Sequence, residues 1–208
     1  MVVSAVIPAY NEEKNISLVL DVVTQVPDLK EVIVVSDGST DNTAAIVKTY
    51  PVQLIALPEN LGKGGAMIIG TKAAQGDYIL FLDADLVGLK VEHIKCMLAS
   101  IKDNYDMIVG IFDNGRKTTD LAQVIAPFLS GQRIVKKEHL FKISNLHISR
   151  FGVEVALTKY AAQNNLMVKE VLLRDLSHVM KEEKLGLVKG FAYRLKMYWE
   201  IAKNVTHG

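Results

Sequence analysis

The first half of the chain alternates short apolar runs with segments of helical periodicity, and this alternation restricts the possible folds more than any other feature. Strand-like runs followed by helical patterns predict a parallel sheet with right-handed crossover connections, which is an α/β fold. We expect Asn11 to cap the first helix. The strand-like runs are residues 2–7, 32–35, 52–57, 78–82 and 106–111, and the expected helices lie near 12–23, 42–50, 66–74, 91–101 and 151–162.

An acidic pair, Asp83 and Asp85, follows the apolar run that begins at Tyr78. Because a strand alternates its side chains, we expect both carboxylates on one face, roughly 6 to 7 Å apart along the chain. Hard oxygen ligands at the carboxyl end of a parallel strand suit Mg²⁺ or Mn²⁺, which complete their coordination with substrate phosphates and water. A nucleoside diphosphate is therefore the first candidate ligand, and a solvated acidic loop is the alternative.

Composition restricts the functional class. The 208 residues include 24 Lys and Arg and 23 Asp and Glu, so no overall charge indicates nucleic-acid binding. The single Cys96 excludes an internal disulfide, fits a reducing, cytoplasmic compartment, and is expected in the core beside Ile94 and Met97. No run approaches the ~18 apolar residues of a membrane span, and the amino terminus lacks a signal peptide's basic start. We expect a soluble or peripheral protein.

Four polar turns are expected at one edge of the sheet, because the carboxyl ends of parallel strands lie together. A bound nucleotide needs a flat surface for its base, carboxylate acceptors, and positive charge near its phosphates. Tyr10, Asp37, Lys63 and a metal at Asp85 supply these features, although Asp37 is also placed to cap a helix. The turns are residues 8–12, 36–41, 62–65 and 83–85.

Two later segments carry an excess of positive charge. Residues 113–150 contain seven basic and three acidic side chains, which favours either a solvated face or a pocket for an anionic, phosphorylated acceptor. Residues 185–203 combine apolar and basic positions at helical spacing. Such a helix covers its own core, forms a homodimer contact, or lies on a membrane surface.

Four motifs in the first half resemble the family-two-like glycosyltransferases of the GT-A fold. They are Ala-Val-Ile-Pro-Ala-Tyr-Asn-Glu-Glu at 5–13, Val-Val-Ser-Asp-Gly-Ser-Thr-Asp at 34–41, Asn-Leu-Gly-Lys-Gly-Gly-Ala at 60–66, and Phe-Leu-Asp-Ala-Asp at 81–85. The resemblance implies a mostly parallel, Rossmann-like sheet flanked by helices. It also implies sugar transfer from a nucleotide donor, with Mg²⁺ or Mn²⁺ bound at the Asp-x-Asp motif.

The second half narrows the resemblance to glucosyl-3-phosphoglycerate synthases, through motifs at 115–120, 129–133 and 151–155 and through His178. The implied metal ligands are Asp85 and His178, the implied donor is UDP-glucose, and retention of configuration is favoured. The segment between Thr118 and Ser130 is shorter than in those synthases, which leaves the acceptor open. By this resemblance, nucleotide contacts come from Pro8, Tyr10, Glu12, Asp37, Lys63 and Asp83, and acceptor contacts come from Gly115, Arg116 and Thr118.

Catalytic roles are expected for Asp85, Arg116 and Glu154. Charge builds on the leaving diphosphate, and a metal together with Lys63 or arginine side chains would stabilise it. Glu154 either orients Arg133 or a lysine through an ion pair, or touches the acceptor. Arg133 is counted among the residues that bind substrate.

Three other functions remain open on the sequence alone. A polyprenyl-phosphate glycosyltransferase would share the same donor half, and a non-catalytic sugar-nucleotide-binding domain would keep the fold. A sugar nucleotidyltransferase would open with a glycine-rich, arginine-containing phosphate loop, which residues 8–12 do not form. We expect one domain, made of a nucleotide-sugar-binding half at 1–112, an acceptor-side half at 113–184 and the amphipathic helix at 185–208.

Overall fold

The computed structural model describes residues 1–113, 130–143 and 152–178 of the chain. Its contacts divide the chain into two compact units, Met1–Ser177 and His178–Gly208. The fold described below is that of the first unit.

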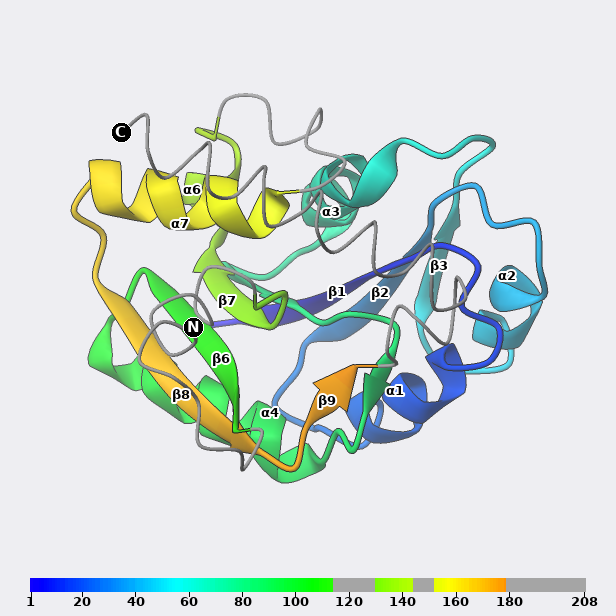
Figure 1. The fold of residues 1–208 in the computed structure, drawn as a ribbon, viewed down its shortest axis with the longest axis horizontal. Helices are drawn as coiled ribbons and strands as arrows, with labels where there is room; N and C mark the ends of the chain where they lie inside the picture. Colours follow the sequence, from blue (N-terminus) through cyan, green and yellow to red (C-terminus); the bar gives the residue numbers. More distant parts are fainter. Residues whose placement is uncertain (114–129, 144–151, 179–208) are drawn as a thin grey trace, which may run out of the picture. The chain divides into compact units, whose positions relative to one another are not determined.

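A seven-stranded mixed sheet forms the centre of this unit, in the order β3-β2-β1-β4-β7-β6-β8 (Figure 1). β1 pairs in parallel with β2 and β4, β2 with β3, and β6 with β8, whereas β7 runs antiparallel to both of its neighbours. The α/β class and the mostly parallel sheet are confirmed. The strands are β1 (Val3–Ala9), β2 (Glu31–Ser36), β3 (Gln53–Ala56), β4 (Tyr78–Phe81), β6 (Met107–Asp113), β7 (Arg133–Lys136) and β8 (Val168–Arg174).

Helices cover both faces of the sheet (Figure 1). One core contains apolar side chains of α1 and α4, and the other contains those of α3, α6 and α7. A short pair of strands, β5 (Leu86–Val87) and β9 (Ser177–His178), forms a second sheet. The helices are α1 (Ile16–Val23), α2 (Thr43–Val47), α3 (Gly62–Ala73), α4 (Val91–Ala99), α6 (Lys137–Leu140) and α7 (Val153–Gln163), and a 3-10 turn, η1 (Ser100–Asp103), follows α4.

Three local predictions are wrong. The first helix begins at Ile16 because Asn11 adopts a left-handed backbone (φ 54°), and its Oδ1 accepts the Thr40 N–H at 2.9 Å instead of capping the helix. The glycine-rich segment is the first turn of α3 and not a loop before it. Cys96 was expected in the core, but it is exposed on α4, whereas Ile94 and Met97 of the same helix are buried.

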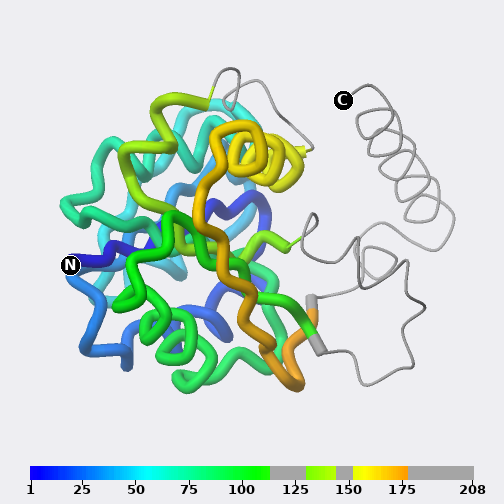
Figure 2. The backbone as a smooth tube through the Cα atoms, turned by 90° about the vertical axis from the view of Figure 1, so that its left-hand side faces the viewer, coloured from blue at the N-terminus to red at the C-terminus, as the bar shows by residue number. Residues whose placement is uncertain are grey.

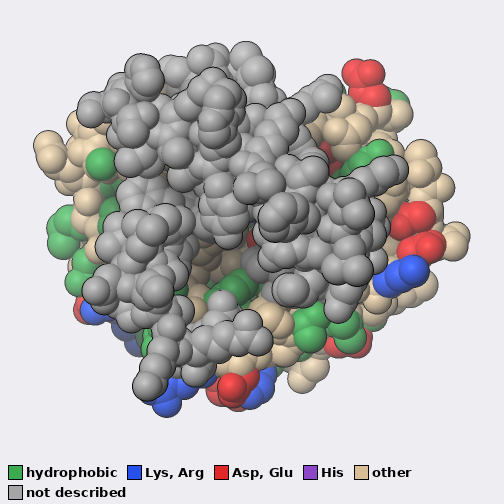
Figure 3. All heavy atoms as spheres, in the orientation of Figure 1, with side chains coloured by type: hydrophobic (Ala, Val, Ile, Leu, Met, Phe, Trp, Pro, Cys, Tyr) green, Lys and Arg blue, Asp and Glu red, His purple; other side chains and the backbone are tan. Residues whose placement is uncertain are grey.

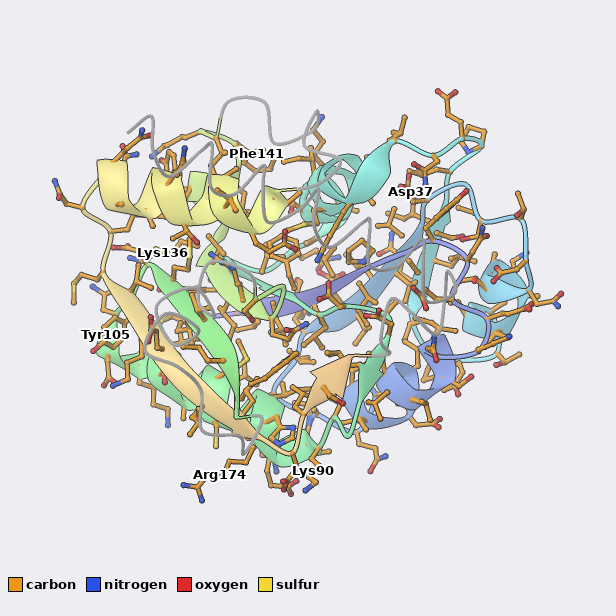
Figure 4. All side chains as sticks on the ribbon, in the orientation of Figure 1. Asp37, Lys90, Tyr105, Lys136, Phe141 and Arg174 are labelled. Atoms are coloured by element: carbon orange, nitrogen blue, oxygen red, sulfur yellow. The ribbon has the colours of Figure 1, made fainter. Side chains whose placement is uncertain are left out.

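Asp106 connects the amino-terminal ends of β6 and β8 with the carboxyl end of the antiparallel β7, at the edge of the sheet opposite the polar turns. Its Oδ1 lies 2.6 Å from Lys136 Nζ and 3.5 Å from His139 Nε2, and its Oδ2 accepts the Met167 N–H at 2.9 Å (Figure 4). Partial burial raises the pKa of the Asp106 carboxyl, but the hydrogen bonds from Lys136 and Met167 outweigh burial and lower it overall.

Replacing Asp106 with Asn should lower the free energy of unfolding at neutral pH by about 1–3 kcal/mol, because the Lys136 ammonium loses its charged acceptor. The contribution of a carboxylate with a lowered pKa is complete above its unfolded pKa and is lost as the pH falls through its folded pKa. The difference between wild type and Asp106→Asn should therefore shrink below about pH 4. Urea denaturation across pH measures it, with exposed Asp103→Asn as the control. A difference independent of pH would contradict the ion pair.

Candidate functional site

The polar turns do meet at one edge of the sheet. Pro8 lies near the end of β1, Asp37 directly follows β2, and Lys63 is in the first turn of α3, which follows β3. Asp83 and Asp85 follow β4. Since β3, β2, β1 and β4 are adjacent and parallel, their carboxyl ends place these residues on the same side of the sheet (Figure 1).

Asp37 connects three of these elements. Its carboxylate Oδ1 accepts the Leu61 N–H at 2.7 Å, at the start of α3, and its own N–H donates to the Ala9 carbonyl oxygen at 2.8 Å (Figure 4). Only 3% of Asp37 is exposed, and burial raises the pKa of its carboxyl, opposed by the N–H groups of Leu61 and Gly62. Asp37 therefore caps the amino terminus of α3, the helix-capping role that was named for it beside ligand binding.

The turn after β1 presents an aromatic ring beside a fixed backbone. Tyr10 is 49% exposed, so its ring is open to solvent. The backbone N–H of Glu12 donates to Thr43 Oγ1 at 2.8 Å, and the Glu12 carboxylate accepts a hydrogen bond from Asn15 at 2.9 Å. These contacts hold the turn against α2, and the Tyr10 ring remains a flat apolar surface suited to a base.

Lys63 is the centre of a charged cluster between two carboxylates. Its Nζ lies 2.5 Å from Asp83 Oδ1 and 2.5 Å from Glu154 Oε1, and the two carboxylate side chains are only 15% and 18% exposed. Burial lowers the pKa of Lys63, but the negative charges of Asp83 and Glu154 outweigh it and raise the pKa well above its ordinary value. Of the two roles expected for Glu154, the structure shows an ion pair with a lysine.

Asp83 is also held on its other oxygen. Gln132 Nε2 donates to Asp83 Oδ2 at 2.9 Å, and the Gln132 side chain is fully buried. Gly131 allows this approach, since a Cβ on it would lie 2.3 Å from the same oxygen. No role was predicted for Gln132, because its partner Asp83 lies 49 positions away and β7 was not predicted. The feature of the sequence that could have pointed to Gln132 is the Gly131-Gln132 pair just before the short apolar run at Ile134 and Val135.

Arg133 lies in the core and not in a solvent-facing basic region. It is 1% exposed, its Nε donates to the Ser130 carbonyl oxygen at 2.8 Å, and its Nη1 donates to Thr158 Oγ1 at 2.9 Å. Burial lowers its pKa to about 10, opposed by the charge of Glu154. The expected direct contact with substrate is not favoured by this position, because β7 turns the side chain inward beneath α7.

The acidic pair does not continue the strand. β4 ends at Phe81, and Ala84 and Asp85 form a turn, so the argument from strand alternation is wrong even though both carboxylates lie at the expected edge. Within the described ranges, no cluster of three or more His, Cys, Asp or Glu side chains is arranged to hold a metal. A half-buried carboxylate such as Asp85 nevertheless suits Mg²⁺ or Mn²⁺, which use one or two protein carboxylates beside phosphate oxygens.

Several predicted site residues lie outside the described residues. They are Gly115, Arg116 and Thr118, together with the helix expected at 185–203. His178 begins the second unit, and its side chain is likewise not described. In the part of the chain that the structure describes, no helix has both the length and the apolar character needed to cross a membrane.

Comparison with known proteins gives matches in sequence and in structure. The family profile described as Glycosyl transferase family 2 matches residues 4–159. A dolichyl-phosphate beta-glucosyltransferase from Trichomonas vaginalis is 42% identical over 94 residues, covering 38% of this chain and 28% of that protein. The undecaprenyl-phosphate 4-deoxy-4-formamido-L-arabinose transferase of Proteus mirabilis is 35% identical over 116 residues, covering 51% and 35%. The chain thus spans about a third of the length of these curated relatives.

The fold is similar to that of a solved structure, glucosyl-3-phosphoglycerate synthase from Mycobacterium tuberculosis in complex with Mn²⁺, UDP and glucosyl-3-phosphoglycerate. The TM-score is 0.69 at 23% identity, and the match covers 89% of this chain and 75% of that one. At this identity the likeness establishes the GT-A fold.

Proposed function

Because the chain belongs to glycosyl transferase family 2, we propose that it transfers a sugar from a nucleoside diphosphate donor to an acceptor that carries a phosphate. The observation that supports this most directly is the convergence of Tyr10, Asp37, the Lys63–Asp83 pair and Asp85 at the carboxyl edge of four adjacent parallel strands. The matched residues 4–159 include every one of these positions.

In this proposal, the base lies against Tyr10, and the carboxylates of Asp37 and Asp83 accept hydrogen bonds from the base or ribose. Lys63 donates to one oxygen of Asp83 and Gln132 to the other, and these contacts hold the carboxylate in a fixed position. Lys63 positions Asp83 and Glu154, and its ammonium group is therefore not assigned to the phosphates.

We assign Asp85, with His178, to hold Mg²⁺ or Mn²⁺ beside the diphosphate. A bound divalent cation supplies Lewis-acid stabilisation of charge on the departing diphosphate. The chain's own contribution is to place the carboxylate of Asp85 next to the rigidly held Asp83. Arg116 is assigned to the phosphate of the acceptor.

Two acceptor classes fit, and one relative of each class, the M. tuberculosis synthase and the T. vaginalis enzyme, is named for glucose transfer. The M. tuberculosis synthase is named for glucose transfer to phosphoglycerate, and its fold likeness extends over 89% of this chain. The T. vaginalis relative is named for dolichyl-phosphate glucosylation and has the higher sequence identity. We place 3-phosphoglycerate first and a polyprenyl phosphate second, because the first match covers both halves of the chain.

The test combines thermal shift with product analysis. The full chain is heated with Mn²⁺ and UDP-glucose or GDP-mannose, because a ligand at about 100 times its Kd adds ~2.7 kcal/mol to the folded state. Turnover is then measured with 3-phosphoglycerate or a short polyprenyl phosphate, and NMR of the product's anomeric proton decides between retention and inversion. Metal-dependent stabilisation by UDP-glucose with glucosyl transfer is expected. Stabilisation without any transfer would favour a binding domain, and no stabilisation by any nucleotide would overturn the site.

A further inference from the structure

The last strand of the seven-stranded sheet is β8. The sheet order ends at β8, and among the described residues no strand pairs with its outer side. Figure 2 shows β8 running along the side turned toward the viewer, with no described segment in front of it. An edge strand exposes a row of unpaired N–H and C=O groups, which can hydrogen-bond to another strand.

The side chains of β8 combine apolar and charged residues at this edge. Leu172 is 54% exposed, Val168 is 42% exposed, and Met167, which precedes the strand, is 53% exposed. Natural edge strands usually avoid pairing by being short or by carrying charged side chains, a proline or a bulge. β8 has seven residues, contains no proline and pairs with β6 residue by residue without a bulge. Because Glu170 and Arg174 are charged, a partner strand must present complementary charges opposite them.

We propose that β8 pairs antiparallel with β8 of a second copy of this chain, about a two-fold axis at Leu172. A two-fold axis perpendicular to the sheet makes the interface self-complementary. In this register Leu172 lies opposite its own copy, and Glu170 lies opposite Arg174 at two symmetric positions. Directly opposite residues are on the same face, with Cβ atoms ~4.5–5.5 Å apart, so each Glu170 can form an ion pair with Arg174 of the partner subunit.

Charge complementarity selects this register over its neighbours. An axis at Glu170 would place two like charges directly opposite each other, and an axis at Val171 would place Glu170 opposite Leu172. Glu170 and Arg174 are both exposed, and Figure 4 shows Arg174 pointing away from the body of the described residues. Figure 3 shows that both acidic and basic side chains reach the surface along the lower margin of that view.

The apolar residue at the proposed axis continues an existing core. Leu172 is paired with Ile111 on β6, and Ile111 packs against the core beneath α3 and α7. Two Leu172 side chains facing each other would extend that apolar surface across the interface and remove both from water. The same pairing would place the two seven-stranded sheets in one continuous sheet.

The first experiment is a charge exchange, read by analytical ultracentrifugation of the full chain over a wide range of concentration. The wild type should sediment as a dimer. Glu170→Arg or Arg174→Glu should each shift it toward monomer, because each creates two like-charge pairs, and the double exchange should restore the dimer. Both positions are exposed, so the fold should be kept. The proposal would be overturned if the wild type were monomeric, or if neither single substitution weakened the dimer.

The second experiment is a cross-link. In a Cys96→Ser background, Leu172→Cys places two thiols opposite each other, within the ~3.5–4.5 Å Cβ separation that a disulfide spans after small adjustments. Val168→Cys is the matched control, because in this register the Val168 positions of the two copies lie far apart along the paired strands. Oxidation should give a covalent dimer for Leu172→Cys alone. Cross-linking at Val168, or none at Leu172, would exclude the axis.

Discussion

Replacing Asp85 with Ala is expected to remove metal-dependent sugar transfer while leaving the fold intact. Loss of the metal would remove several kcal/mol of charge stabilisation from the transition state, so turnover should fall roughly 10³-fold or more. Asp85 lies in a turn beyond the end of β4 and is half-buried, so the free energy of unfolding without ligands should change by about 1 kcal/mol or less. Turnover should therefore fall sharply in Asp85→Ala, while its free energy of unfolding stays close to that of the wild type.

The measurement is turnover against Mn²⁺ concentration, together with thermal shift by UDP-glucose in the presence and absence of metal. Asp28→Ala is the control, because Asp28 is an exposed turn residue before β2, at the opposite edge of the sheet. Wild type and Asp28→Ala should gain stability from nucleotide only when metal is present, and Asp85→Ala should lose that dependence. Near-normal, chelator-sensitive turnover in Asp85→Ala would mean that the metal is held elsewhere.

The parallel part of the fold could be predicted because each strand and helix there carries its own local pattern. β1, β2, β3 and β4 are apolar runs bounded by turn residues, and their carboxyl ends carry the polar residues in an order that specifies one sheet edge. The motifs in those turns made the family recognisable. These signals are local in sequence, and they do not depend on how distant segments pack.

An ion pair between Glu154 and a lysine was one of two expected roles, but the particular partners in the cluster behind Asp83 could not be predicted, because they come from segments far apart. Lys63 and Glu154 are separated by 91 positions, and no periodicity links them. β7 was missed because its apolar Ile134 and Val135 are flanked by basic residues, which made the segment resemble a solvated region. Arg133 is buried because it lies on β7. The missed strand therefore also explains why Arg133 was expected to contact substrate.

Lys63→Met should cost more stability than any single change at the surface. Removing the ammonium leaves Asp83 and Glu154, each less than one-fifth exposed, facing each other without their shared cation. Breaking a buried ion pair costs about 3–5 kcal/mol, and because Lys63 is 29% exposed we expect a smaller loss of ~2–4 kcal/mol. Since the pKa of Lys63 is raised, its stabilising charge is complete at neutral pH and is lost only as the pH rises past its unfolded value of about 10.4.

Urea denaturation at neutral pH measures this effect, with Lys72→Met as the control, because Lys72 is an exposed lysine on the same helix. Glu154→Gln should recover part of the loss when combined with Lys63→Met, because one carboxylate then has no charged neighbour to repel it. If Lys63→Met were no worse than Lys72→Met, the ammonium would be available to a ligand, and Lys63 would return to the role of a phosphate contact.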